Sequence, residues 1–216
     1  MKELVLPDQM AQRVHDLYTR MEAEYDRVAS ELHFGCEGCP DNCCDSHFQH
    51  HTYLEWAYLW KGLRELPVEK FEQVEQWAAA HVRECSRAES RGERPQVMCP
   101  LNEEGLCILY KHRMLVCRTH GVPASMQRPD GQVLRFPGCF RCQELVEKRG
   151  ESEEDVPQVE RTPLLRELVM MEDEFLSRRR HLYPKVKLTI AEMIIKGPPM
   201  VPLSFCERGC DDENCG

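Results

Sequence analysis

Four cysteines lie within nine residues of one another: Cys36, Cys39, Cys43 and Cys44. Two cysteines separated by two residues, as in Cys36-Glu-Gly-Cys39, can direct both sulfur atoms to one metal ion, because a tight turn brings the side chains together. Cys139 and Cys142 have the same spacing, and the 216-residue chain contains 13 cysteines in all. The spacing predicts a metal centre held by thiolates.

The adjacent pair Cys43-Cys44 behaves differently from a spaced pair. Neighbouring side chains on an extended backbone point to opposite faces. The two cysteines would then serve two sites, or one would serve a site and the other the core. A disulfide between them would need strained geometry, and we do not expect one.

Eight thiols from the densest regions are the candidate metal ligands: Cys36, Cys39, Cys43, Cys44, Cys99, Cys107, Cys117 and Cys139. Eight thiolates are enough for two four-cysteine sites. Zinc takes four thiolates in a tetrahedron and has no redox chemistry, whereas an iron–sulfur cluster also takes four thiolates and can carry electrons. A four-thiolate centre is net negative, so the nearby Arg113, Arg118 and Arg141 are candidate hydrogen-bond donors to sulfur.

Several other residues could have either a structural role or a functional one. Cys85 and His81 fall on the apolar face of a predicted helix and are expected in the core. His47 and His51 could face one ion if they were helical, but they precede a helix cap and are expected in a loop. Cys117 with a histidine three residues on, as nucleophile and base, is a weaker interpretation than a metal ligand.

Composition limits the classes of protein that fit. The formal net charge is −9, which argues against nucleic-acid binding because that needs a basic surface. The N-terminal residues form no apolar signal segment, and no run is long and apolar enough to span a bilayer. We therefore expect a cytoplasmic protein with reduced thiols, in which closely spaced cysteines are more often metal ligands than disulfide halves.

The elements that must position these thiols are mainly helical. Apolar residues at helical spacing predict a helix over residues 8–33 that stops at Gly35, and a Thr52–Glu55 capping box opens a second helix to about Glu65. Tyr53, Trp56 and Trp60 form one stripe of it and are expected in the core. A third helix begins at Pro67, a loop covers residues 87–96, and residues 97–142 form short elements around turns such as Asn102–Gly105.

The last third of the chain follows the same pattern. Residues 151–160 form an acidic linker, a helix runs from Thr162 to about Leu182, and a Thr189–Glu192 capping box opens a short helix. A polar tail over residues 203–216 carries Cys206, Cys210 and Cys215. The expected fold is a single, mainly α domain over residues 1–216. In it, a helical scaffold, including C-terminal helices within 161–197, clasps an irregular cysteine-rich metal-binding middle with at most short strands.

Four segments together carry a family resemblance: the cluster Cys36–Cys44, Cys99-Pro-Leu, Cys107-Ile-Leu-Tyr-Lys-His-Arg113 and Cys117-Arg-Thr-His120. They resemble the YkgJ-type cysteine-cluster family of CxxCxxCC proteins, described as zinc- or iron-chelating domains, which includes proteins labelled flagellin N-methylase. The resemblance covers about residues 36–142. It implies metal binding, and with eight thiols it favours an iron–sulfur cluster, for example of the 4Fe-4S type, over zinc as the cofactor.

The chain also departs from the family pattern. Three residues, 40–42, precede the paired cysteines where the family has two, which leaves the assignment of Cys43 and Cys44 open. Met114 stands where the family usually has proline, and His120 stands where an aromatic residue is common, so His120 becomes a candidate ligand.

Two alternative functions remain beside a metalloprotein. One is a protein-modifying group-transfer enzyme similar to flagellin lysine N-methylase, although the chain has no Gly-rich loop between a strand and a helix to cradle a nucleotide-like cofactor. The other is a metal-handling or interaction protein whose tail cysteines pass an ion to a partner. A protein partner or substrate is expected under either alternative, whereas a nucleic acid or a membrane is not.

Overall fold

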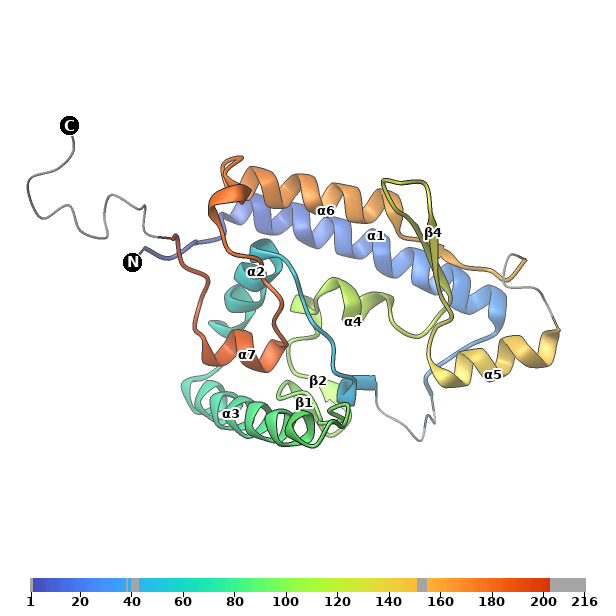
Figure 1. Ribbon diagram of the computed structural model, residues 1–216, viewed down its shortest axis with the longest axis horizontal. Helices are drawn as coiled ribbons and strands as arrows, with labels where there is room; N and C mark the ends of the chain where they lie inside the picture. The colour runs from blue at the N-terminus through green and yellow to red at the C-terminus, as the bar shows by residue number, and fades with distance from the viewer. Residues whose placement is uncertain (1, 38, 40–42, 151–154, 203–216) are drawn as a thin grey trace, which may run out of the picture.

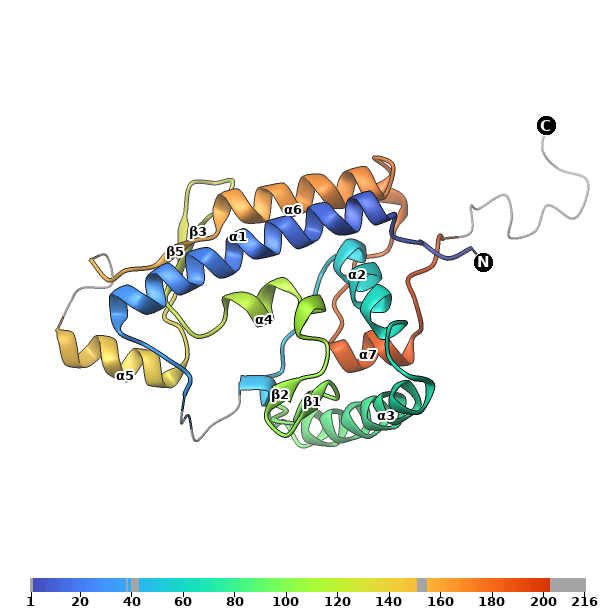
Figure 2. The same ribbon diagram turned by 180° about the vertical axis from the view of Figure 1, so that it is seen from behind.

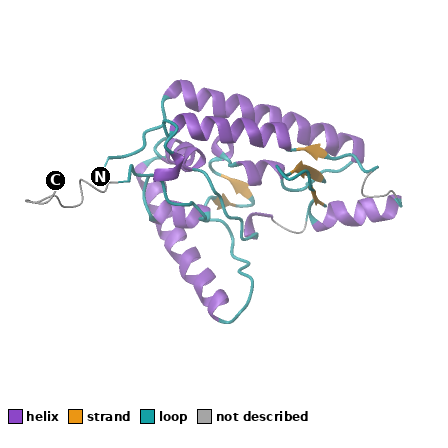
Figure 3. Cartoon of the chain, turned by 45° about the horizontal axis from the view of Figure 1, so that its top comes forward, coloured by secondary structure: helices purple, strands orange, loops and turns teal. Residues whose placement is uncertain are grey.

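The computed structural model describes residues 2–37, 39, 43–150 and 155–202. Within these ranges the helices are α1 (Asp8–Leu32), α2 (Tyr53–Leu63), α3 (Val68–Ser90), α4 (Leu115–Thr119), α5 (Phe140–Arg149), α6 (Thr162–Phe175) and α7 (Ile190–Ile195). The strands are β1 (Asn102–Glu103), β2 (Leu106–Cys107), β3 (Ala124–Gln127), β4 (Val133–Phe136) and β5 (Val159–Glu160). The prediction of a mainly α fold is confirmed (Figure 3). No helix in these ranges is long and apolar enough to cross a bilayer.

Helix α1 is the longest element and lies alongside α6, with α4 packed against its other side (Figures 1 and 2). Its apolar face is fully buried, as Val14, Leu17 and Tyr18 show. The predicted extent, residues 8–33, is confirmed to within one residue, but the helix is capped by His33 and not by Gly35. It ends at Leu32, and the left-handed φ of 52° at His33 lets the His33 N–H return to the carbonyl of Ser30.

Two buried carboxylates join the helices around the start of α2. Glu55 accepts hydrogen bonds from Tyr18 Oη at 2.9 Å and from the Leu115 N–H at 2.8 Å, so it ties α1, α2 and α4 together. Glu172 of α6 accepts from the Tyr53 and Leu54 N–H groups at 3.0 and 2.7 Å, which satisfies the first turn of α2.

The predicted cap and core of α2 are confirmed in most respects. The Thr52 hydroxyl caps the helix by accepting from the Glu55 N–H, although the Glu55 carboxylate bonds the Thr52 hydroxyl and not its N–H. The stripe Tyr53, Trp56 and Trp60 is buried, as expected.

Helix α3 packs against α7 at one end of the molecule, below α2 in Figure 1. Pro67 is its N-cap, and the helix continues to Ser90, so the loop predicted from residue 87 begins later. Cys85 is 7% exposed on the inner face, which confirms its expected place in the core. Helix α7 begins with the predicted capping box, in which Thr189 and Glu192 bond each other's backbone N–H groups.

Two small sheets interrupt the helices. Strands β1 and β2 form an antiparallel hairpin, and the second sheet has the order β4-β3-β5 with β5 parallel to β3. Val159 in β5 is fully buried and Val156 is 5% exposed, so the second half of the predicted acidic linker is part of the core. Helix α5 was not predicted. Helix α6 ends at Phe175, before the predicted Leu182, because Ser177 and Arg178 take left-handed φ values.

Candidate metal centre

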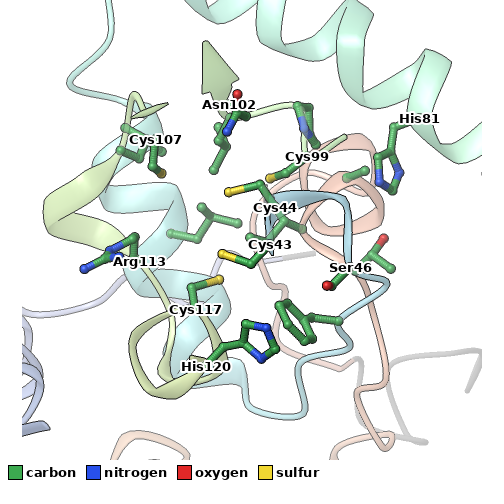
Figure 4. A pocket seen from close by; sticks show the side chains of 18 of the residues that line it. Cys43, Cys44, Ser46, His81, Cys99, Asn102, Cys107, Arg113, Cys117 and His120 are labelled. Atoms are coloured by element: carbon green, nitrogen blue, oxygen red, sulfur yellow. The ribbon is translucent and has the colours of Figure 1, made fainter. Parts of the chain in front are cut away.

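Five cysteines from three segments line a cavity of about 200 Å³ between α2, α4, α7 and the β1–β2 hairpin. They are Cys43 and Cys44 from a short 3-10 helix (Cys43–Asp45) before α2, Cys99 and Cys107 from the ends of the hairpin segment, and Cys117 from α4. The expectation that Cys43 and Cys44 lie on extended backbone and point to opposite faces is therefore wrong, because the 3-10 turn lets both line the same cavity. Figure 4 shows their side chains directed toward the same space. No disulfide joins any of the ten cysteines in the described ranges.

Four of these side chains form one mutually interacting set, which we call the pocket thiols: Cys44, Cys99, Cys107 and Cys117. Every pair in the set interacts: the charges of the other three raise the pKa of Cys99, those of Cys107 and Cys44 raise that of Cys117, and that of Cys44 raises that of Cys107. This set joins residues more than seventy positions apart in the chain. The structure therefore brings together four of the eight thiols that the sequence marks as ligands.

The backbone around the hairpin explains how Cys99 and Cys107 reach the cavity. Glu104 and Gly105 take left-handed φ values of 51° and 86°, and the Asn102 side chain accepts from the Gly105 N–H at 3.1 Å. This is the turn expected from the sequence, and it pairs Asn102 with Cys107. The Cys99 N–H donates to the Cys44 carbonyl at 2.9 Å, which holds the loop of the paired cysteines against the hairpin.

Two of the pocket sulfurs already accept backbone hydrogen bonds. The Leu101 N–H is directed at the Cys99 sulfur and the Leu109 N–H at the Cys107 sulfur, and each contact lowers the pKa of its thiol. Such bonds stabilise thiolate charge. Burial acts in the opposite direction and dominates at both residues, so each pKa is raised overall.

The remaining pocket thiols differ in charge state. Burial raises the pKa of Cys117 to about 12, so its sulfur stays protonated at neutral pH. A hydrogen bond from the Cys43 thiol lowers the pKa of Cys44 to about 6 and raises that of Cys43 well above its usual range. Cys44 is therefore the thiolate of the set, and a cation in the cavity would favour loss of the other protons.

Helix α4 is fixed by the Arg118 side chain, which is 5% exposed. Its guanidinium donates to the carbonyls of Arg113 and Lys111, both at 2.7 Å, and pairs with Glu22 of α1. The prediction that Arg118 donates to sulfur is therefore wrong, because its donors are committed to the loop that carries Cys117. Arg113 also pairs with Glu22, and it lines the cavity with its Nε unpartnered.

A second set lies outside the cavity, and we call it the outer thiols: Cys36, Cys39 and Cys139. Cys36 Sγ lies 4.0 Å from Tyr25 Oη, and the charges of Cys36 and Cys139 both raise the pKa of that tyrosine, after burial. Arg141 on α5 interacts with all three outer thiols, Cys39 first. The eight candidate ligands thus divide between two places, with Cys43 interacting with Cys36 on one side and Cys117 on the other.

Cys142 is not part of this second set, although its spacing from Cys139 suggested a chelating pair. Cys139 is the N-cap of α5, and Cys142 lies in the first turn with its side chain completely buried beside Val28 and Val159. Burial raises the pKa of Cys142 to about 11. The spacing here serves a helix turn, so Cys142 acts as a small core residue.

One histidine in the cavity wall is both buried and without a hydrogen-bond partner. His50 is 2% exposed and lines the cavity, and neither ring nitrogen has a hydrogen-bond partner. Burial lowers its pKa. The backbone of His50 is held by reciprocal hydrogen bonds with Leu188. No local sequence pattern predicts this pairing.

The other candidate histidines do not converge on one ion. His47 lies near Glu89, whereas His51 Nδ1 lies 3.2 Å from the Val186 carbonyl. His120 lines the cavity and packs edge-on against Phe48 with ring centroids 5.0 Å apart, the packing expected of an aromatic residue. The tail cysteines Cys206, Cys210 and Cys215 lie outside the described residues.

As the side chains stand, no group of three or more His, Cys, Asp or Glu residues in the described ranges is arranged to hold a single metal ion. No family model, curated protein or solved structure compared with the chain matches it. The candidate centre therefore depends on the geometry of this chain alone.

Proposed function

We propose that the chain is a metalloprotein that binds an iron–sulfur cluster through Cys44, Cys99, Cys107 and Cys117. The observation that carries the proposal is the set of four mutually interacting thiols around one cavity. Buried cysteines that serve only packing have no reason to gather from three segments of the chain, whereas four thiolates are the usual ligands of an iron–sulfur cluster. The helices then act as a scaffold around an irregular cysteine-rich middle.

The size of the cavity favours a cluster over a single zinc ion. Four thiolates around one zinc ion, each about 2.3 Å from it, stand only about 3.8 Å from one another. The pocket thiols surround a cavity of about 200 Å³, which is far larger than one ion. In a four-iron cluster each thiolate binds its own iron atom, so the sulfurs stand farther apart around a larger body. When bound, such a cluster could carry electrons.

The polar atoms of the cavity support an occupant of this kind. Arg113 Nε is buried in the cavity wall without a partner, and the Asn102 side chain donates a hydrogen bond that lowers the pKa of Cys44. Unpartnered buried donors cost about 1–3 kcal/mol each. A cluster offers sulfur acceptors and net negative charge, which suit an arginine and an amide donor. The YkgJ-type resemblance of residues 36–142 is consistent with the same proposal.

The test is anaerobic purification of the full chain, followed by visible absorption and by iron and sulfide analysis. We expect a brown protein with broad visible absorption and with iron and sulfide in equal amounts. The variant Cys117→Ala should lose the colour. The matched control is Cys85→Ala, a buried cysteine of the core, which should keep it.

The outcomes separate the possibilities. A folded, colourless and metal-free protein contradicts metal binding altogether. Zinc without sulfide, lost in Cys117→Ala, contradicts the cluster and leaves a zinc centre. Equal loss of colour in Cys85→Ala would mean that the thiols act through folding and not as ligands.

A further inference from the structure

We propose that the outer thiols Cys36, Cys39 and Cys139, together with Cys43, form a second and separate centre that binds a single divalent ion of the zinc type. The adjacent cysteines Cys43 and Cys44 then belong to different centres. This inference rests on the proposed function for the assignment of Cys44 to the cluster.

Two of the outer thiols, Cys36 and Cys139, lie near one tyrosine hydroxyl. Tyr25 Oη lies 4.0 Å from Cys36 Sγ and packs against Gly121, where an added Cβ would stand 2.5 Å from it. The Gly121 carbonyl accepts from the Cys139 N–H at 3.0 Å. Contacts through Tyr25 and Gly121 therefore bring the end of α1, the loop after α4 and the start of α5 together around these thiols.

The local turn at Cys36 suits chelation of one ion. The Cys39 N–H donates to the Cys36 carbonyl at 3.1 Å, so the backbones of these two residues are held together. A tight turn of this spacing is how Cys-x-x-Cys pairs direct two sulfurs to a zinc ion. Cys36 and Cys43 are exposed, whereas Cys39 and Cys139 are half-buried, so the first two side chains can rotate to close around an ion.

Counting ligands assigns Cys43. A four-iron cluster takes one thiolate per iron, and the pocket thiols already supply four, which leaves Cys43 surplus in the cavity. The outer thiols number three and lack a fourth ligand for a tetrahedral ion. Cys43 interacts with Cys36 as well as with Cys44 and Cys117, and its charge also reaches Tyr25, so it lies within reach of the outer set.

The charge around the outer thiols also fits. Four thiolates and one divalent ion carry a net charge of about −2. The guanidinium of Arg141 faces Cys36, Cys39 and Cys139 and can offset part of that charge. Cys142, three residues from Cys139, points into the core and cannot take part.

The experiment measures iron and zinc per chain in the full-length protein, purified anaerobically from medium supplemented with zinc. Wild-type protein should hold about one zinc besides the cluster. Cys139→Ala should lose the zinc and keep the iron, whereas Cys142→Ala should keep both. The adjacent pair gives the sharpest comparison: Cys43→Ala should lose zinc, and Cys44→Ala should lose iron.

A second measurement uses cobalt in place of zinc in the same variants. Tetrahedral cobalt thiolate absorbs in the visible, and its bands should appear in Cys44→Ala but not in Cys43→Ala or Cys139→Ala. Circular dichroism of each variant verifies that the helices remain, so that loss of metal is not loss of fold.

The results distinguish this inference from the proposed function. Iron with sulfide but no zinc in wild-type protein, or zinc retained in Cys139→Ala, overturns the second centre and leaves the cluster. Loss of both metals together in Cys43→Ala and Cys44→Ala overturns the division of the pair. Absence of all metal from wild-type protein overturns the proposed function itself.

Discussion

The pocket thiols and the outer thiols contain the same chemical group but differ in how the chain holds it. The pocket thiols are fixed by the Cys99–Cys44 backbone hydrogen bond, by the turn at Gly105 and by the anchored helix α4. The outer thiols depend on one short turn and the N-cap of α5, and Cys36 is exposed.

This difference leads us to expect different behaviour from the two proposed centres. A site on rigid, buried backbone keeps its ligands in place without the metal, whereas an exposed site gains its order on binding. Cys85 and Cys142 represent a third case, in which a buried thiol forms part of the core. Burial alone therefore does not distinguish a candidate ligand from a core cysteine in this fold.

The largest expected effect concerns metal removal. With a water-soluble chelator added anaerobically, zinc from the outer centre should leave at least about tenfold faster than iron from the pocket, because exposed ligands open first. Metal-sensitive dyes for the two ions measure both rates in one sample. In denaturant the two rates should become equal, and equal rates in native buffer would remove the distinction between the centres.

The next effect concerns the ion pairs of Glu22 that hold the segment carrying Cys117 against α1. Glu22→Gln removes the carboxylate partner of Arg113 and of Arg118, whose side chain is only 3% exposed. An uncompensated buried guanidinium should lower the free energy of unfolding by about 3 kcal/mol. Glu24→Gln is the matched control on the same helix, because its exposed pair with Arg27 is worth less than about 0.5 kcal/mol. Urea unfolding measures both, and equal losses would contradict the anchor.

A pH effect should be specific to the pocket side. His50, His81, His112 and His120 all line the cavity, and burial lowers the pKa of each. As the pH falls below about 6.5, these histidines take up protons in the unfolded chain but remain neutral in the folded protein. The free energy of unfolding therefore falls toward acid pH, and it is unaffected above that range.

The variant His50→Phe tests this pH effect at its most buried residue. Two charged neighbours also act on His50: the charge of Glu55 raises the pKa of His50, and the charge of His51 lowers it further. Each such histidine contributes at most about 1.4 kcal/mol per pH unit. The substitution should flatten the fall in stability between pH 6.5 and 5, measured by urea unfolding at a series of pH values. An unchanged slope would exclude His50 as a contributor.

The smallest effect concerns the wall that α7 gives to the cavity. Thr189→Ala removes the hydroxyl of the capping box and should cost about 1 kcal/mol of stability. Thr19→Ala on the exposed side of α1, where the hydroxyl only bonds the His15 carbonyl, should cost less than about 0.5 kcal/mol. Thermal unfolding compares the two, and a larger cost at Thr19 would reverse the expected order.

Local chemistry made parts of this fold predictable from sequence. The Thr189–Glu192 box, the turn at Gly105 and the buried face of α1 each depend on residues a few positions apart, and all three are present. Helix α5 was missed although Cys142, Leu145 and Val146 have helical spacing and Gly150 is a typical C-cap. The Cys139–Cys142 spacing is typical both of a metal-chelating turn and of the first turn of a helix, so it does not by itself indicate the helix.

The division of the thiols was not predictable from spacing. It depends on where the backbone hydrogen bond from Cys99 to Cys44 holds the paired cysteines, and that contact crosses more than fifty residues. The buried His50 depends in the same way on its pairing with Leu188. Such long-range backbone contacts have no local signal in the amino-acid pattern.

The contact between Glu172 and the start of α2 has a consequence for biosynthesis. Glu172 completes the first turn of α2, and Thr189, Ile190 and Ala191 form the last wall of the cavity. These residues leave the ribosome well after Cys117, so the nascent chain presents its thiols to the cell before the cavity can close. A metal ion delivered during translation would therefore meet open thiols. A metal ion delivered to the finished protein would have to enter a cavity whose wall is already folded.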